Sequence, residues 1–286
     1  MSGLPIVTAD SPVICDVARE VGCFYLRHPL FPDERCERAV ELARAFFALP
    51  GDVKRALTID LSPHFRGYSE MRNERDWREQ IHFGREEREI LSGRVFDTLR
   101  GPNLWPEDPL WKAEVVQLMA DLEQAGREVL ARFGAWMEED ERAYLLLKMI
   151  HYHASPWGVS RPGVAPHVDF SWITLLLQDS VGGLEIRTPS GDWIAARPIP
   201  GTLVVNLGEV LQFASGGFYE STPHRVTTSD RTRVSLPFFL NPSLDTVIAP
   251  RAGEAHVHRV LRPEPLHFGE AEWKRKGLGV WCAECC

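Results

Sequence analysis

The sequence predicts an α+β fold that is mainly β, in which helices pack around a β-sandwich or barrel. The chain has 286 residues, of which 44% are hydrophobic and 25% are charged, so it can bury a substantial core as an ordinary globular protein does. Helical periodicity is found in the first half of the chain. From about residue 144, short apolar runs alternate with Gly and Pro turns, as they do in sandwiches and barrels.

Two segments of the first half have the spacing of helices. In residues 33–50 (DERCERAVELARAFFALP) apolar side chains recur at three- and four-residue intervals, and Pro50 with Gly51 ends the pattern. Residues 109–137 predict a long helix with apolar residues recurring on one side.

The second half predicts a series of strands. Each run is short, rich in Val, Ile, Leu, Phe and Tyr, and bounded by turn residues. The predicted strand regions are residues 144–153, 172–179, 182–188, 191–201, 202–213, 224–230 and 233–242.

Charge and composition exclude some partners. The formal net charge is −8, so neither nucleic acid nor an anionic membrane surface is an expected partner, and a small-molecule substrate is favoured. No apolar run approaches the length of a membrane span, and the first residues lack the pattern of a secretion signal. The expected location is therefore the cytoplasm, and the sequence does not predict an oligomeric state.

The cysteines lie near the two ends of the chain. Three of them, Cys15, Cys23 and Cys36, come early, and the others form the tail WCAECC. The tail has one CxxC spacing but no second ligand pair near it, so a structural zinc site is not expected. The spacing does not indicate a disulfide framework either.

His167 and Asp169 are the first candidates for a metal site. They lie two residues apart in APHVDFSWITLLLQD, at the start of a predicted strand region. Residues i and i+2 of a strand share a face, so both side chains can reach one point. Two histidines and one carboxylate hold Fe(II) in non-haem oxygenases. Taken alone, the pair is explained equally well as ordinary polar residues at a strand end.

Further clusters in the sequence would complete such a site. His224 opens a predicted strand after a turn-rich segment and is the best third ligand. Arg233 and Ser235 are again i and i+2 on a strand, and a guanidinium beside a hydroxyl is well suited to binding a carboxylate.

The chain resembles the 2-oxoglutarate- and Fe(II)-dependent oxygenases of the isopenicillin N synthase-like family. The resemblance runs through HVDFSWITLLLQD, the segment from GGLEIRTPSGDW to ESTPHRV, and RVSLPFFLNP, and in the first third through VAREVGCFYLRHPL, FFALPGDVKRAL and FRGYSEMRNERDWREQIHFG. It implies a double-stranded β-helix (jelly-roll) core with flanking helices. It also implies one oxygenase domain over residues 1–286, with a helical and mixed region at 1–143, the iron-bearing core at 144–245 and an extension at 246–286.

The resemblance also implies roles for particular residues. His167, Asp169 and His224 match the iron ligands, so no catalytic side chain beyond the metal ligands is expected. The residues that match the 2-oxoglutarate clamp are Arg233, Ser235 and Tyr152. If Tyr152 faces the interior, strand alternation turns His151 and His153 to the other face of the sheet.

The implied activity is a dioxygenase reaction on a small molecule. Fe(II), 2-oxoglutarate and O2 would be used, with ascorbate as a stimulant of turnover, and hydroxylation, desaturation or cyclisation would accompany release of succinate and carbon dioxide. The chain departs from the family's frequent residues at Ile150, Val168 and Ser171, none of which is an implied iron ligand. The alternatives are an iron oxidase of the same family without 2-oxoglutarate, an ethylene-forming activity, and a non-catalytic jelly-roll binding protein.

Candidate substrate contacts come from two places in the sequence. Phe170 and Trp172, just past the implied ligands, would supply an apolar wall. Local positive charge could attract an anionic group such as the carboxylate of an amino acid or a derivative. The segment FRGYSEMRNERDWREQIHFG places Arg66, Tyr68, Arg72, Arg75 and Arg78 close together, and Arg161 adds another cation. The candidate contacts among them are Arg72, Arg75, Arg161 and Tyr68. Ion pairing of these arginines with the acids that alternate with them between residues 70 and 79 is the simpler interpretation.

Overall fold

The computed structural model describes residues 3–72, 77–89, 92–134, 137, 142–154, 162–227, 229–250 and 264–277. The predicted contributions of Arg75, Arg161 and the cysteine tail at residues 282–286 lie outside these ranges. Cys15, Cys23 and Cys36 are free cysteines. No helix among the described residues is long and apolar enough to cross a membrane.

Helices are found on both sides of the chain's central sheets. The α-helices of the described residues are α1 (Ile14–Val21), α2 (Asp33–Phe47), α3 (Gly51–Arg55), α4 (Pro109–Phe133), α5 (Glu209–Ala214) and α6 (Phe268–Lys276), and the short 3-10 helices are η1 (Ile59–Leu61) and η2 (Val95–Leu99). Helices α2 and α4 confirm the two predicted helical segments. Helix α5 was not predicted, because the apolar run at 202–213 looked like one long strand.

Strands make up the rest of the framework. They are β1 (Ile6–Thr8), β2 (Cys23–Arg27), β3 (Gly67–Arg72), β4 (Trp77–Gly84), β5 (Leu145–Tyr152), β6 (Pro162–His167), β7 (Ile173–Gln178), β8 (Leu184–Arg187), β9 (Trp193–Ala195), β10 (Leu203–Leu207), β11 (His224–Thr227), β12 (Arg233–Leu240), β13 (Val247–Ile248) and β14 (Leu266–His267). Each of the seven predicted strand regions contains one of them.

Strands β5 to β12 form a jelly roll. The eight-stranded sheet has the order β1-β2-β10-β7-β12-β5-β4-β3, and the four-stranded sheet has the order β6-β11-β8-β9. The consecutive strands of the second half are thus divided between two sheets whose inner faces share a cavity, which is the double-stranded β-helix that was predicted. Strands β1 to β4, from the first third of the chain, extend the larger sheet at both edges.

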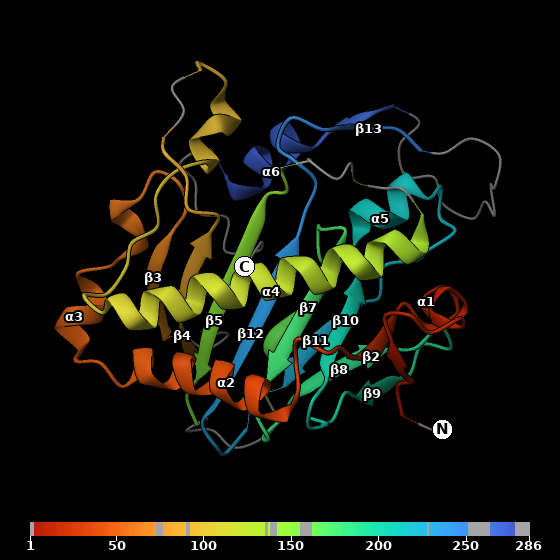
Figure 1. Cartoon of the computed structure of the whole chain (residues 1–286), viewed down its shortest axis with the longest axis horizontal. Helices are drawn as coiled ribbons and strands as arrows, with labels where there is room; N and C mark the ends of the chain where they lie inside the picture. Colours follow the sequence, from red (N-terminus) through yellow and green to blue (C-terminus); the bar gives the residue numbers. More distant parts are fainter. Residues whose placement is uncertain are drawn as a thin grey trace.

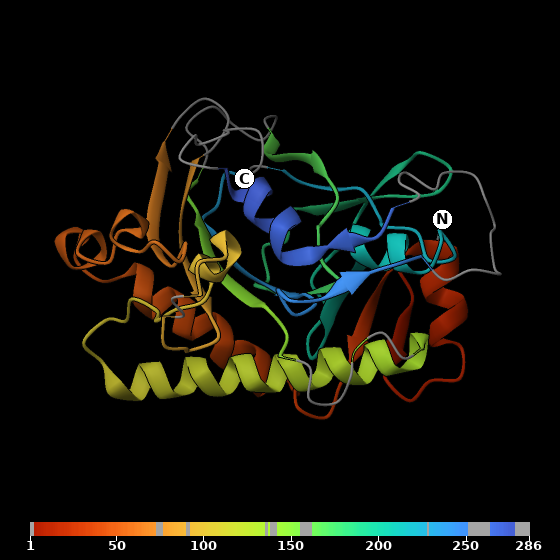
Figure 2. The ribbon, with the colours of Figure 1, turned by 90° about the horizontal axis from the view of Figure 1, so that it is seen from above.

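Side-chain alternation gives the larger sheet two different faces. On β5, Leu147 and Met149 belong to the apolar core, whereas Lys148 and Ile150 line the cavity between the sheets. The core face is covered by α2 and α4, which cross the sheet in Figure 1. Figure 2 shows α4 on one side of the sheet and α6 on the other. The cavity therefore lies on the side of the sheet away from α4.

Helix α4 is well determined by its sequence. Asp108 caps it by accepting hydrogen bonds from the backbone N–H groups of Leu110 and Trp111, and Pro109 occupies the first turn, where no N–H is needed. Gly126 lets the helix approach the sheet closely, since a Cβ atom there would lie 2.8 Å from Leu240. An alanine at this position would require the end of the Leu240 side chain to shift.

Candidate active site

The three predicted metal ligands meet at one end of the smaller sheet. His167 ends β6 and His224 begins β11, and the two are cross-strand partners. Asp169 lies two residues beyond the end of β6, so the expectation that the His-x-Asp pair sits within one strand was wrong. The loop nevertheless places the Asp169 carboxylate beside both histidines. Its Oδ1 atom lies 3.7 Å from the Nε2 atom of each one.

Neighbouring groups orient the three candidate ligands. The His167 ring contacts the Ala165 carbonyl oxygen through Nδ1 at 2.8 Å. The His224 Nδ1 atom lies 2.9 Å from the Asn206 amide, and the Thr174 hydroxyl donates to Asp169 Oδ2 at 2.7 Å. These contacts leave both Nε2 atoms and Oδ1 directed at a common point. Such outer contacts fix the tautomer and the orientation of metal-binding side chains.

The charges at this point suit a cation. Burial acts to raise the pKa of Asp169, but His224, His167 and the hydrogen bonds of Thr174 and Asn206 outweigh it and hold the pKa below its usual value. Burial and the nearby His224 lower the pKa of His167, which favours the neutral, metal-binding form of its ring. One carboxylate and two imidazoles, with one ligand atom from each within 4.8 Å of the others, form a donor set that fits Fe(II).

A second cluster on the larger sheet suits a carboxylate. Arg233 pairs in register with Tyr152 across β12 and β5, and the guanidinium lies 3.7 Å from the centre of the Tyr152 ring. Arg233 is only 5% exposed, and its Nε and Nη2 atoms have no hydrogen-bond partner among the described residues. A Cβ atom on Gly183 would lie 3.2 Å from the guanidinium carbon, so the glycine gives the arginine room. Two buried donors in a fork fit a carboxylate group.

Both clusters open onto the same cavity between the two sheets. His167, Asp169 and His224 line it, and so do the clamp residues predicted from the sequence. Ser235 is among them, two positions from Arg233 on the inward face of β12. The structure therefore brings together all the predicted metal and 2-oxoglutarate residues, which are His167, Asp169, His224, Tyr152, Arg233 and Ser235.

The predicted substrate contacts lie elsewhere. Arg72 is exposed and donates to Glu70 at 2.6 Å. This ion pair agrees with the simpler interpretation, in which the arginines of the charged segment pair with neighbouring acids. Tyr68 faces the opposite side of the sheet and donates to Glu79. Phe170 stacks on Phe268 of α6, and Trp172 is buried in the core. None of these four side chains is among the residues that line the cavity.

Two other cations line the cavity instead. Arg78 belongs to the predicted arginine-rich segment, whereas the sequence did not indicate Lys148. Arg78 on β4 is the cross-strand partner of Tyr152, which places Arg78, Tyr152 and Arg233 in one row across three strands. Lys148 lies on the same face of β5 as Tyr152. In the sequence Arg78 is one charge among many, and only the register of β4 against β5 reveals its position.

Known proteins share this architecture. Residues 143–242 match the 2OG-Fe(II) oxygenase superfamily, and residues 12–108 match the N-terminal region of the non-haem dioxygenases in morphine synthesis. A homoarginine-6-hydroxylase of Glycine max is 31% identical over 276 residues, covering 85% of this chain and 82% of its own length. A 2-oxoglutarate-Fe(II) type oxidoreductase of Emericella nidulans is 30% identical and covers 90% of this chain and 84% of its own.

Solved structures of other proteins have a similar fold. A putative 2OG-Fe(II) oxygenase family protein from Caulobacter crescentus has a TM-score of 0.78 and 27% identity, covering 96% of this chain and 98% of its own. A Neurospora crassa protein in complex with alpha-KG (2-oxoglutarate) and 5-formyluracil also has a TM-score of 0.78, with 25% identity and 95% coverage of both chains.

Fold and site together define a non-haem iron oxygenase built on a jelly roll. The chain belongs to the 2OG-Fe(II) oxygenase superfamily, and it is an oxidoreductase that uses Fe(II) and 2-oxoglutarate. This membership decides against the alternative of a non-catalytic binding protein.

Proposed function

We propose that the enzyme hydroxylates a small molecule that carries a carboxylate, such as an amino acid or a derivative of one. In this proposal His167, Asp169 and His224 bind iron, and Arg233 with Ser235 and Tyr152 binds the distal carboxylate of 2-oxoglutarate. Bound iron and 2-oxoglutarate supply the oxidation of an unactivated carbon, with release of succinate and carbon dioxide.

The charge of the cavity carries the substrate part of the proposal. Its described lining contains three cations, Arg78, Lys148 and Arg233, and one acid, Asp169. When Fe(II) and the two negative charges of 2-oxoglutarate are included, two positive charges remain. An anionic group on the substrate would neutralise part of this excess in a place where water screens charge weakly. Two relatives named as homoarginine-6-hydroxylases, one from Glycine max and one from Arabidopsis thaliana, are named for an amino acid substrate, which supports the same class.

The chain's own residues then have distinct tasks. Arg233 holds 2-oxoglutarate at one end of the cavity, and the row formed with Tyr152 places Arg78 beside it. Lys148 lies further along β5, with its ammonium nitrogen 5.3 Å from the centre of the Phe239 ring. We assign the substrate carboxylate to Arg78 and Lys148, and the less polar part of the substrate to the aliphatic residues of the smaller sheet, Val164, Leu184, Ile186 and Val226.

A turnover screen tests this proposal. Succinate formation is measured with amino acids, their N-acyl derivatives and aromatic acids, each paired with its neutral amide, and product masses distinguish hydroxylation from desaturation or cyclisation. A charge-assisted hydrogen bond contributes about 1.5–3 kcal/mol, so Arg78→Met and Lys148→Met should each raise the KM for the acid by about tenfold or more. The Kd for 2-oxoglutarate should change little.

Arg225→Met is the matched control. Arg225 lies on β11 close to the site but pairs with Glu185 at 2.6 Å and does not line the cavity. The Arg225→Met variant should therefore keep the wild-type KM for the acid and the wild-type Kd for 2-oxoglutarate. If the amides turn over as well as the acids, or if both variants keep the wild-type KM, the substrate assignment is wrong while the oxygenase activity stands.

A further inference from the structure

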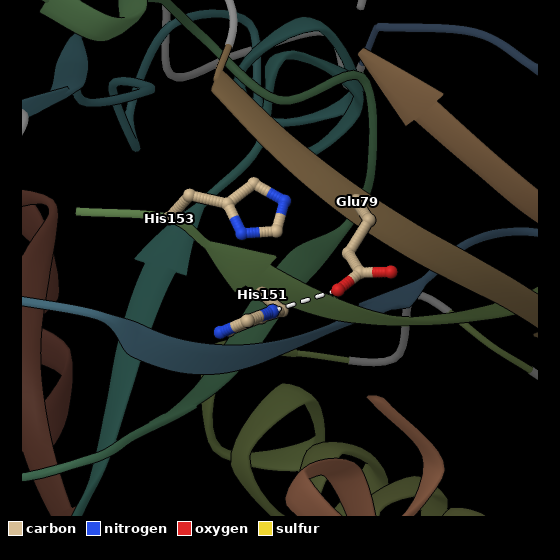
Figure 3. Close-up of side chains that lie close together, drawn as sticks. All are labelled: Glu79, His151 and His153. Carbon is tan, nitrogen blue, oxygen red and sulfur yellow. Dashed lines mark hydrogen bonds and ion pairs between the residues drawn. The ribbon is translucent and has the colours of Figure 1, made fainter. Parts of the chain in front are cut away.

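A second group of metal-binding side chains lies on the opposite face of the larger sheet. Glu79 of β4 and His151 of β5 are cross-strand partners, and His153 follows two residues later. The backbone N–H of His153 donates to the Trp77 carbonyl at 3.1 Å, so the pairing of the two segments continues past the end of β5. Because i and i+2 share a face, both histidines turn to the same side as Glu79, as Figure 3 shows.

The spacing within this group is close to that of metal ligands. One atom from each of the three side chains lies within 4.8 Å of the others. Glu79 Oε1 and His151 Nδ1 are joined by a hydrogen bond of 2.8 Å (Figure 3), and two ligand atoms on one tetrahedral zinc ion lie roughly 3.3 Å apart. On binding, a metal would replace the hydrogen bond between Glu79 and His151, and these two atoms would move apart by about half an ångström.

Glu79 is held as an ionised carboxylate whose Oε1 atom is directed at the histidines. Its Oε2 atom accepts hydrogen bonds from Lys54 at 2.6 Å and from Tyr68 at 2.7 Å. Burial acts to raise the pKa of this group, but the hydrogen bonds of His151, Lys54 and Tyr68 outweigh it and lower the pKa to about 2. Oε1 faces the histidines, and Oε2 is committed to the surrounding protein, as in metal sites whose carboxylates are oriented by outer contacts.

His153 has a ring nitrogen that no hydrogen bond among the described residues satisfies. Its Nε2 atom is buried and has no hydrogen-bond partner among the described residues. Burial and the charge of His151 lower the pKa of His153, so the ring is neutral and has a lone pair to donate. The two imidazoles meet edge to face at 4.8 Å between ring centres, and Phe47 of α2 stacks on His151. A buried nitrogen without a partner costs stability, and coordination to a metal would offset that cost.

We propose that Glu79, His151 and His153 form a second metal site, which binds a divalent transition metal such as Zn(II) and is separate from the iron site. Two imidazoles and a carboxylate bind Zn(II) more tightly than Fe(II) in the usual order of affinities. The site joins β4 to the end of β5, directly behind the row of Arg78 and Tyr152. The positive charge of Lys54 beside Glu79 limits the affinity, so the bound metal should exchange with chelators.

Zinc binding is measured in a background that lacks the competing sites. His167→Ala with His224→Ala removes two of the three proposed iron ligands, and Cys282, Cys285 and Cys286 are replaced by Ser so that thiolates do not capture zinc. Titration calorimetry and metal analysis after gel filtration should give one equivalent of Zn(II) for this background. Adding His153→Gln should weaken binding by more than about a hundredfold, since even the loss of an outer contact costs 10–100-fold.

His28→Gln is the control in the same background. His28 forms a similar pair, with Glu128 at 2.9 Å, but it is not part of a three-ligand group among the described residues. The His28→Gln variant should still bind one equivalent of Zn(II). In addition, Zn(II) should raise the melting temperature of the background protein but not that of the His153→Gln protein. The proposal is overturned if the background binds no zinc, or if His28→Gln and a folded His153→Gln protein lose zinc equally.

Discussion

Replacing Arg233 with Ala should separate co-substrate binding from stability. Arg233 is 5% exposed, and two of its side-chain nitrogen atoms have no hydrogen-bond partner among the described residues. If these nitrogens hold 2-oxoglutarate, the variant loses a charge-assisted contact of about 1.5–3 kcal/mol and leaves the carboxylate buried without its partner. The Kd for 2-oxoglutarate should therefore rise by about tenfold to a hundredfold or more.

The stability of the protein without 2-oxoglutarate should respond differently. Burial lowers the pKa of Arg233, which means that its positive charge is disfavoured where it lies. Removing an incompletely paired buried charge should thus cost little stability or even increase it. Arg233→Lys should recover only part of the affinity, because an ammonium group lacks the fork of two donors.

The assay is calorimetric titration of 2-oxoglutarate into the Mn(II)-loaded protein without oxygen, accompanied by a thermal melt without ligand. Arg225→Ala, whose guanidinium pairs with Glu185, serves as the control and should keep the wild-type Kd. An unchanged Kd in Arg233→Ala would refute the assignment of this arginine as the clamp. A large loss of stability without ligand would show that its role is structural.

Other predictions follow from the same contacts. His167→Ala, Asp169→Ala and His224→Ala should each abolish iron-dependent succinate formation while circular dichroism remains that of the folded protein. Thr174→Val removes the hydrogen bond to Asp169 Oδ2 and should lower iron affinity by about 10–100-fold in a metal titration. Glu79→Gln should cost up to about 3 kcal/mol at pH 7 in urea unfolding, because the pKa of Glu79 is about 2 in the fold and near 4.5 when unfolded. Since this depressed pKa stabilises the fold only above the unfolded value, the difference from wild type should shrink as the pH falls through 4.5 toward 2.

Much of the fold was predictable because its signals are local. The helix at 33–50 and the strand at 233–242 show their periods in the sequence, and the structure places α2 and β12 there. The alternation of β5 also predicted correctly that His151 turns away from the cavity that Tyr152 lines. Helix α5 was missed because a short apolar run such as VLQF has no period that separates helix from strand.

The parts of the site that were not predictable depend on register between distant strands. Arg78 enters the cavity because β4 pairs with β5 so that Arg78 lies opposite Tyr152, and a shift of one residue would exchange it for Glu79. The position of Asp169 depends on a loop rather than on strand alternation. Its backbone carbonyl accepts a hydrogen bond from the Glu209 N–H at 2.7 Å, a contact with the start of α5 that no local pattern announces.

The two faces of β5 look toward two similar donor sets with different chemistry. The iron set belongs to the smaller sheet and lines the cavity on one side of β5, whereas the Glu79 set lies on the other face of β5. Both sets contain two histidines and a carboxylate, and in both a neighbouring group holds one carboxylate oxygen, Thr174 at Asp169 and Lys54 at Glu79. The iron set opens onto a cavity whose lining includes Arg233, so a carboxylate can be held beside the metal. The Glu79 set instead lies against the Phe47 ring and the cation of Lys54. A metal bound there has no clamp of this kind for 2-oxoglutarate among the described contacts, so it should link the strands without supporting turnover.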